Sequence, residues 1–430
     1  MFFKKADLID CIRFPICFQH SRAEPMRSSS TEISFLFMVV LGLLMGLPPI
    51  ATDLYLPAMP SIAESLQARP DAVQQTLTLY LISFSLCQLI FGPLSDAKGR
   101  KKVMLAGLVI FSIGSVLCAF VSDIATLIVA RGLQGIGAAA IVVTVPAIIR
   151  DKATGAEFSR VMGIIWMVMG LAPLVAPLLG SLILLFAGWR MIFIVLGLTS
   201  ASVAVLYMFS VGETLAPSKR VSFNAGNLAR NYLAVLAQKQ AMLYMLCSAL
   251  AVCAMFGFIA ASPFVYIEYY GVSEQGYGVL FGINITLMII MTRVSNRLVG
   301  KHGPQRMLGL AVTMILVSSL LMILISTMQR PPLALLVVAI MLFIGTAGIL
   351  NANAMALVLN RLGHISGSAS AVAGSMRFGL SAFAPVAVGQ LYDGTAFALS
   401  AVMAACGLGA VACFGLALLL NEKEEKAAVA

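Results

Sequence analysis

Residues 92–102 read Gly-Pro-Leu-Ser-Asp-Ala-Lys-Gly-Arg-Lys-Lys and join two long apolar runs. This stretch holds four cations in a chain of 430 residues that is 60% hydrophobic and only 11% charged. A short cationic turn between two apolar runs is typical of a cytoplasmic loop that joins two membrane-crossing helices. The turn therefore indicates a membrane protein, and the runs on either side of it show how the rest of the chain is built.

Apolar stretches long enough to cross a bilayer recur throughout the chain, whose mean hydropathy of +0.98 excludes a soluble domain. A crossing helix needs about 20 apolar residues to span roughly 30 Å of hydrocarbon. The stretches are continuous and do not alternate, which favours helices over a barrel. We predict an all-α membrane protein with twelve transmembrane helices. The predicted spans are 33–52, 72–95, 103–122, 124–149, 161–189, 191–212, 240–267, 275–292, 307–329, 331–360, 362–392 and 394–421.

The cations between the spans predict the topology. With an inside start, 23 of the 28 Lys and Arg residues fall in inner segments, and the outer loops hold only Arg69, Arg190 and Arg330. Cytoplasmic loops carry such an excess of cations, so both termini are predicted to be cytoplasmic. The net charge of +10 then belongs to contact with membrane lipid at the inner leaflet, and no nucleic-acid partner is expected.

The one long polar connection, 213–240, divides the spans six and six. The halves resemble repeats, because sliding the second over the first by about 204 residues lays Leu298 and Gly303 over Leu94 and Gly99. Chance similarity between apolar helices is the alternative. The predicted units are a disordered cytoplasmic extension at 1–30, in which Met26 is the expected true start, a six-helix bundle at 31–212, a cytoplasmic linker at 213–240, a second six-helix bundle at 241–420 and a cytoplasmic tail at 421–430.

The eight cysteines lie mostly inside apolar spans and have no framework spacing. We expect them to be small buried residues, with no disulfide and no metal. The chain has no G-x-x-x-x-G-K-[ST] phosphate loop, and no cofactor is expected.

The turn at 92–102 resembles a signature that joins helices two and three in the major facilitator superfamily. That signature reads G-x-x-x-D-x-x-G-R-K and is carried here by Gly92, Asp96, Gly99, Arg100 and Lys101. The resemblance implies two pseudo-repeats of six helices around a central cavity, with this turn acting in gating.

Arg131 lies inside the fourth span, with Gln134 and Gly135 on the same helical face. A midplane arginine costs several kcal/mol if it meets lipid, so it is expected to face a wet cavity or a partner. The run Arg131-Gly-Leu-Gln-Gly-Ile-Gly is similar to the R-x-x-x-G-x-G motif on helix four of the superfamily, which implies a role in proton coupling. The alternative is a structural arginine bound by backbone carbonyls.

Asp53 closes the first span among prolines that break or kink the helix, and an irregular helix at membrane depth implies a cavity. The string Asp53-Leu-Tyr-Leu-Pro resembles the D-M-Y-L-P signature of the bicyclomycin/chloramphenicol-resistance group of drug:proton antiporters, with Leu54 replacing the usual Met. That resemblance makes Asp53 the candidate for binding proton and substrate in turn. The alternative is a helix-end aspartate wetted by the outer loop.

Gly170, Pro173, Pro177 and Gly180 lie on one stripe of the fifth span and resemble the antiporter motif of helix five. Small residues let two helices approach closely, and prolines bend a span. The motif's usual G-P and final G-G are replaced here by Ala-Pro and by Gly180-Ser181. The resemblance implies export and a leak-resistant contact between the halves.

Other polar and aromatic side chains within the spans are candidates for the substrate cavity. Arg377 is either a counter-ion for an acidic ligand or a packing residue. The candidate cavity residues are Tyr55, Tyr80, Phe84, Gln134, Trp166, Phe256, Tyr266, Asn284, Asn353 and Arg377.

The resemblance to this antiporter group implies a monomeric exporter of small amphipathic drugs or metabolites, driven by protons, in the bacterial inner membrane. No catalytic residue is expected. A proton-coupled importer of a sugar or metabolite is the first alternative, and a membrane-embedded enzyme or receptor is the second. The spans contain no His/Glu/Cys constellation that would favour the second alternative.

Overall fold

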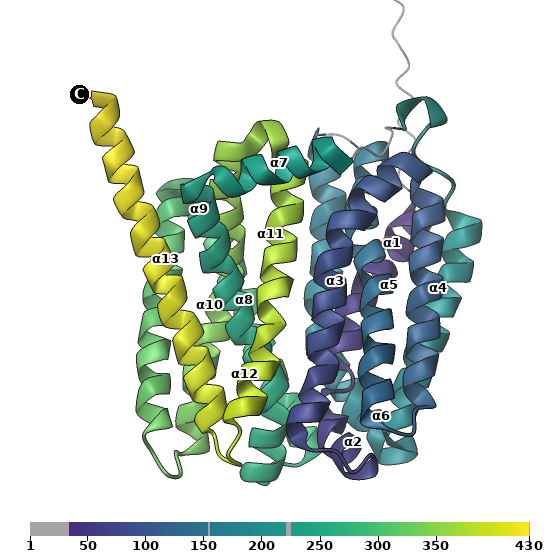
Figure 1. The fold of residues 1–430 in the computed structure, drawn as a ribbon, viewed down its shortest axis with the longest axis vertical. Coiled ribbons are helices and arrows are strands. Elements are labelled where there is room, and N and C mark those ends of the chain that lie inside the picture. Colours follow the sequence, from purple (N-terminus) through teal and green to yellow (C-terminus); the bar gives the residue numbers. More distant parts are fainter. Residues whose placement is uncertain (1–33, 154, 221–224, 430) are drawn as a thin grey trace, which may run out of the picture.

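The computed structural model describes residues 34–429, except residue 154 and residues 221–224. This part of the chain is almost entirely helical and contains no strand (Figure 1). In chain order the elements are α1 (Phe35–Asp53), η1 (Leu56–Ala58), α2 (Met59–Ser65), α3 (Pro70–Lys98), α4 (Arg100–Ala119), α5 (Ile124–Lys152), α6 (Gly155–Ser210), η2 (Pro217–Lys219), α7 (Ala225–Ala237), α8 (Lys239–Pro263), η3 (Phe264–Tyr269), α9 (Glu274–Ser326), α10 (Leu333–Leu362), η4 (Gly363–Ile365), α11 (Ser366–Ser381), α12 (Phe383–Leu391) and α13 (Phe397–Val429).

Ten helical segments within the described residues are long and apolar enough to cross a membrane. Two of them, in α6 and α9, are 51 and 53 residues long, more than twice the crossing length, and both bend sharply. The bends occur at Gly188 and Gly303, whose φ angles of 69° and 74° are strained for any residue with a side chain. When each of the two bent helices is counted as two crossings, the ten segments become twelve crossings, consistent with the predicted twelve spans.

The helices form two bundles side by side, with α1 to α6 in one and α8 to α13 in the other (Figure 1). Helix α7 lies across one end, which we call the α7 end, and α2 lies at the opposite end, which we call the α2 end. Tyr232 of α7 donates a hydrogen bond to the Leu89 carbonyl of α3, 3.2 Å away, and so ties the connecting helix to the first bundle. The predicted unit boundaries stay predictions, and the predicted extension at 1–30 lies outside the described residues.

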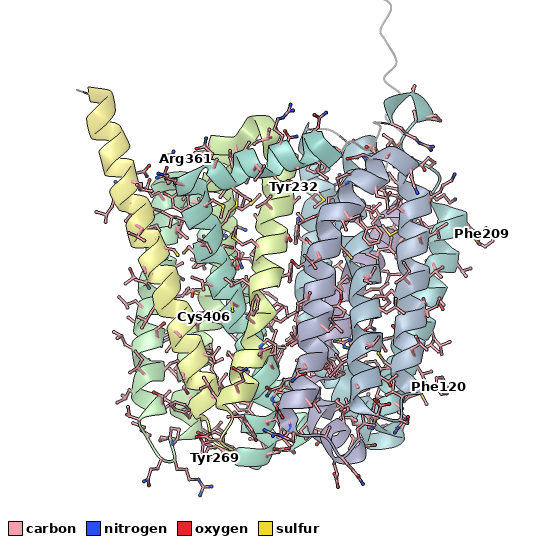
Figure 2. The ribbon with its side chains drawn as sticks, viewed as in Figure 1. Phe120, Phe209, Tyr232, Tyr269, Arg361 and Cys406 are labelled. Atoms are coloured by element: carbon pink, nitrogen blue, oxygen red, sulfur yellow. The ribbon has the colours of Figure 1, made fainter. Side chains whose placement is uncertain are left out.

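The flanks of the bundles carry apolar side chains that face outward. Phe120 and Phe209 point away from the first bundle in Figure 2 and are 77% and 80% exposed. Large exposed apolar surfaces of this kind suit a hydrocarbon surrounding and not water.

Contacts between the bundles run from their middle to the α2 end. In the middle, the Ser85 hydroxyl of α3 lies 2.7 Å from the Ser375 carbonyl of α11. At the α2 end, Gly389 of α12 packs so closely on α3 that an added Cβ would lie 2.9 Å from the Asp71 Cβ atom. The bundles are therefore closely packed over this part of their shared face.

Candidate functional site

Asp53 is the last residue of α1, and its side chain is buried, with 3% of its surface exposed. The Thr52 hydroxyl lies 3.0 Å from its Oδ1 atom and 2.9 Å from the Pro49 carbonyl. Beyond Asp53 the chain leaves its straight course and continues in η1 and α2, each with a proline in its first turn. Asp53 therefore lies at a break in the first crossing helix and inside the protein, and not in an open outer loop.

Arg131 of α5 is fully buried between two tyrosine rings. Its central guanidinium carbon lies 4.4 Å from the centre of the Tyr55 ring and 4.7 Å from that of Tyr80. Its Nη1 donates to the Ala51 carbonyl at 3.0 Å and to the Gln134 side chain. Since a desolvated cation–π contact contributes about 2 kcal/mol, the two rings offset part of the cost of burying the charge.

Arg131 and Asp53 are neighbours that make no ion pair with each other. The cation lies within electrostatic reach of the carboxyl, but the ion pairs of the described residues do not include this one. Among the residues that the structure describes, the Nε and Nη2 atoms of Arg131 also have no hydrogen-bond partner. The site thus combines a buried acid with a buried cation whose hydrogen-bond donors are only partly used.

The two tyrosines are fixed by hydrogen bonds to other helices. The Tyr55 hydroxyl lies 3.2 Å from the Thr76 hydroxyl of α3, and the Tyr80 hydroxyl lies 3.3 Å from the Pro48 carbonyl of α1. Helices α1, α3 and α5 therefore meet around the guanidinium, and we call Asp53, Arg131, Tyr55 and Tyr80 the Arg131 cluster.

The glycines that follow Arg131 let α5 approach its neighbours. A side chain at Gly135 would collide with the Tyr80 carbonyl of α3, and one at Gly137 would collide with the Phe111 backbone of α4. Gln134, just before these glycines, donates to the Ser115 hydroxyl of α4 at 2.7 Å. The R-x-x-x-G-x-G run thus positions the cation and also permits the close packing that holds it.

The predicted antiporter stripe lies on α6, and only part of it packs against the Arg131 cluster. Gly180 touches the Leu54 carbonyl, next to Asp53, so closely that any side chain there would collide with it. Gly170 faces open space, with no atom within 4 Å of the place where a Cβ would stand. Pro173 and Pro177 lie inside the same helix without breaking it.

The same stretch of α6 joins the two bundles. The Ser181 hydroxyl lies 2.9 Å from the Glu274 carbonyl at the start of α9. One turn earlier on α6, Leu178 packs against Gly278, where an added Cβ would lie 2.8 Å from its side chain. The fifth predicted span is therefore an inter-bundle helix toward the α2 end.

A row of aromatic rings connects the Arg131 cluster to the second bundle. The Tyr80 and Phe84 rings are stacked with their centres 6.1 Å apart. Phe84 meets Phe378 of α11 edge to face at 4.8 Å, and Phe378 lies 6.1 Å from Phe256 of α8. The structure thus brings together Phe84 and Phe256, both predicted cavity residues, through a ring that sequence reasoning did not single out.

The other predicted cavity residues are not brought to the Arg131 cluster by any contact of their own. Tyr266 lies 6.2 Å from the Tyr277 ring, within the second bundle. Asn284 bonds to the carbonyl one turn before it, and Asn353 bonds to the Ile349 carbonyl and to a neighbouring serine. Trp166 of α6 is 54% exposed and makes no ring contact within the described residues.

Arg377 lies in α11, half-buried in the second bundle. Its Nε donates to the Ala373 carbonyl of its own helix at 3.3 Å, and within the described part of the chain its guanidinium makes no other hydrogen bond and no ion pair.

The charged turn lies at the α7 end, and Gly99 is its break point, with φ 97°. Arg100, which starts α4, is buried and makes ion pairs with Asp96 at 2.5 Å and with Asp151, at the end of α5, at 3.1 Å. Its backbone N–H donates to Glu213 at 2.9 Å. One arginine thus ties together the ends of α3, α5 and α6, and its partners Asp151 and Glu213 were not predicted from the sequence.

The remaining residues of the turn have simpler surroundings. Lys101 donates to the Met208 carbonyl near the end of α6 at 2.7 Å. Gly92 lies within α3, with no atom within 4 Å of the place where a Cβ would stand. The role of this turn in gating stays a prediction.

The part of the chain that holds these motifs is matched by a known family. The profile of the Major Facilitator Superfamily matches residues 35–385. The chain belongs to the Major Facilitator Superfamily. As a major facilitator it is a multi-pass membrane protein of a transporter family whose members carry small molecules.

Two relatives of this major facilitator carry resistance names. It is 33% identical over 375 residues to the bicyclomycin resistance protein homolog of Haemophilus influenzae, with 87% of this chain and 94% of the relative covered. It is also 33% identical over 278 residues to the chloramphenicol resistance protein of Pseudomonas aeruginosa, with 64% and 65% covered.

Solved structures show the same fold. The nucleoside transporter NupG superposes with a TM-score of 0.72 at 12% identity, covering 88% of this chain and 99% of that one. At this identity the likeness concerns the major facilitator fold alone.

Proposed function

We propose that this protein exports small amphipathic drugs or metabolites across the bacterial inner membrane in exchange for protons. The relatives named for bicyclomycin and chloramphenicol resistance support export of drugs. The 23 cations predicted on the inner side, which include those at the α7 end, support cytoplasmic termini. Both bundles come from one chain, so a monomer suffices, and the proposed activity is transport without a catalytic step.

The observation that carries the proposal is that Asp53 and Arg131 are buried near each other without forming an ion pair. A buried carboxyl without an ion pair is favoured in its neutral form, whereas the carboxylate needs a partner at this depth. Arg131 has free donors next to Asp53 and bonds only to a carbonyl and an amide. Proton release from Asp53 would therefore draw Arg131 away from Ala51 and toward the carboxylate, and proton uptake would return it.

The break after Asp53 links this exchange to the helices. Gly180 of α6 packs on the Leu54 carbonyl, one residue beyond Asp53, and the next residue, Ser181, contacts α9 of the other bundle. A shift of the Arg131 cluster would thus act on an inter-bundle contact. The packing between the middle and the α2 end supports a state closed toward the outside, as one half of an alternating-access cycle.

The energy of one proton suffices for useful export. A charge that crosses about 150 mV releases about 3.5 kcal/mol. That energy sustains a drug gradient of roughly two to three decades.

The deciding experiment is a set of antibiotic minimum inhibitory concentrations in a pump-deficient bacterial host. Cells that express the protein should tolerate more of at least one amphipathic drug than cells with an empty vector, and a protonophore should abolish the difference. Equal tolerance of every drug by cells with comparable amounts of protein in the membrane would contradict the proposal. Accumulation of a sugar or metabolite in the expressing cells would favour the importer.

A further inference from the structure

Arg377 is the second arginine within the predicted membrane spans, and it lines a gap between three helices of the second bundle. The gap measures about 10 Å³, room for about one water. Its walls are Tyr244, Met245 and Ser248 of α8, Ala354, Met355 and Val358 of α10, and Ala373 and Arg377 of α11. Arg377 therefore adjoins a small pocket inside the second bundle.

The predicted membrane spans of the second bundle provide no negative charge for this cation. No Asp or Glu occurs between residues 275 and 392 or between residues 239 and 267. A guanidinium has five N–H donors, and Arg377 uses one of them, on the Ala373 carbonyl. Intramembrane cations are normally paired with acids or carbonyls because an unpaired charge is costly there. Arg377 thus lacks the counter-ion that its position requires.

The residues beside Arg377 place it at the boundary between the bundles. Gly374, one turn before it, lies against Gln88 of α3, since an added Cβ there would be 2.9 Å from the Gln88 side-chain oxygen. Phe378, the next residue, meets Phe84 of α3 at 4.8 Å and Phe256 of α8 at 6.1 Å. A ligand held between the bundles would therefore find an aromatic wall next to an unpaired cation.

We propose that Arg377 binds the anionic group of a ligand, so that the substrates of this protein include amphipathic organic carboxylates. The carboxylate supplies the missing counter-charge and accepts two parallel N–H bonds from the guanidinium. The gap has room for a group of about the size of one water, so one carboxylate oxygen enters it and the other stays at its mouth. The apolar body then extends toward Phe378, the residue next to Arg377, whose ring lies 6.1 Å from that of Phe256. The inference rests on the proposed function and adds a ligand class to it.

The test compares ligands that differ only in charge. The full chain is purified into discs of zwitterionic lipid, and the binding of 2-naphthoate and of 2-naphthamide is measured by calorimetry at pH 7.5. The wild type should bind the carboxylate at least about tenfold more tightly than the amide, as expected for charge-assisted hydrogen bonds. Arg377→Gln should abolish this preference by weakening naphthoate alone, and Arg377→Lys should retain part of it.

The control is Arg297→Gln, which removes an exposed arginine of α9 and should leave the preference unchanged. The same comparison is made with benzoate and benzamide and with decanoate and decanamide. If the wild type prefers no carboxylate of the three pairs, or if Arg377→Gln keeps the preference, Arg377 is a packing residue and the inference is wrong. If Arg377→Gln weakened the binding of both ligands equally, and Arg377→Lys also lost the preference for the carboxylate, Arg377 would likewise have a structural role.

The readout separates this inference from the proposed function. Binding to the purified protein needs neither a proton gradient nor export. A protein that prefers carboxylates but confers no resistance would contradict the export proposal alone. A protein that confers resistance but prefers no carboxylate would contradict the anion site alone.

Discussion

Gly180 of α6 lies directly against the backbone carbonyl of Leu54, the residue that follows the buried carboxyl of Asp53. The contact is so close that even a methyl group would collide with the carbonyl oxygen. Glycine at this position therefore determines how near the fifth predicted span comes to the break in the first. The place of the acid and the packing of α6 depend on each other.

Gly180→Ala should destabilise the protein by about 1–3 kcal/mol, because backbone atoms would have to shift to admit the added methyl. We expect a lower melting temperature in detergent and weaker drug resistance. Gly163→Ala is the matched control, because this glycine of the same helix has open space around it and alanine favours a helix. Equal stability of the two variants would show that α6 does not rest on Leu54.

Asp53→Asn should leave a folded protein that no longer couples transport to protons, because the amide keeps the size of the carboxyl but cannot lose a proton. Drug resistance should fall to the level of the empty vector, and proton release on adding drug to the purified protein should vanish. Asp123→Asn serves as the control, since this exposed aspartate caps α5 and asparagine caps a helix equally well. Proton release of normal size in Asp53→Asn would remove Asp53 from the proton pathway.

Arg131→Lys and Arg131→Gln should show whether transport depends on the charge of the Arg131 side chain or on its planar shape. Lysine keeps a cation between the tyrosines but loses the planar group that reaches both Ala51 and Gln134, so we expect partial resistance. Glutamine removes the charge that would meet the Asp53 carboxylate, so resistance and drug-induced proton release should both be lost. If both variants merely express less protein and transport normally per molecule, Arg131 is a structural anchor.

Asp96→Asn and Asp151→Asn should slow transport without changing drug affinity, because both acids contact Arg100 at the α7 end and neither belongs to the Arg131 cluster. We expect turnover in proteoliposomes to fall about tenfold or more, with the dissociation constant for drug within about twofold of the wild type. The double variant should lose less than the product of the single effects, since the acids share one arginine. Weaker binding with normal turnover would place the turn in the ligand site.

The sequence predicted the fold well because the signals for membrane helices are long and local. Runs of apolar residues and the cations between them indicate where the membrane spans lie. The predicted boundary between the fifth and sixth spans, at Arg190, lies two residues from the bend at Gly188. The connection predicted at 293–306 proved harder to place, because α9 stays helical across most of it and bends only at Gly303. Charged residues in that stretch are compatible with a helix that extends beyond the hydrocarbon.

The site was harder to predict because an apolar span shows no distinct inner face. Helical spacing placed Gln134 beside Arg131, where the structure has it, since residues three apart share a face. The partners Phe378, Asp151 and Glu213 come from distant segments, and periodicity within one span carries no information about them. Trp166, chosen for its type, is 54% exposed, because large apolar side chains suit lipid as well as a cavity.

The contact between Phe84 and Phe378 also bears on how the transport cycle could be blocked. It lies in the middle of the face shared by the bundles, beside the bond between Ser85 and Ser375. When the two bundles rock against each other, their ends move far and the region near the rotation axis moves little. An edge-to-face pair of rings in that region tolerates a small change of angle. A flat molecule bound between these two rings would hold the bundles in one state. Such a molecule would inhibit export and would not itself be transported.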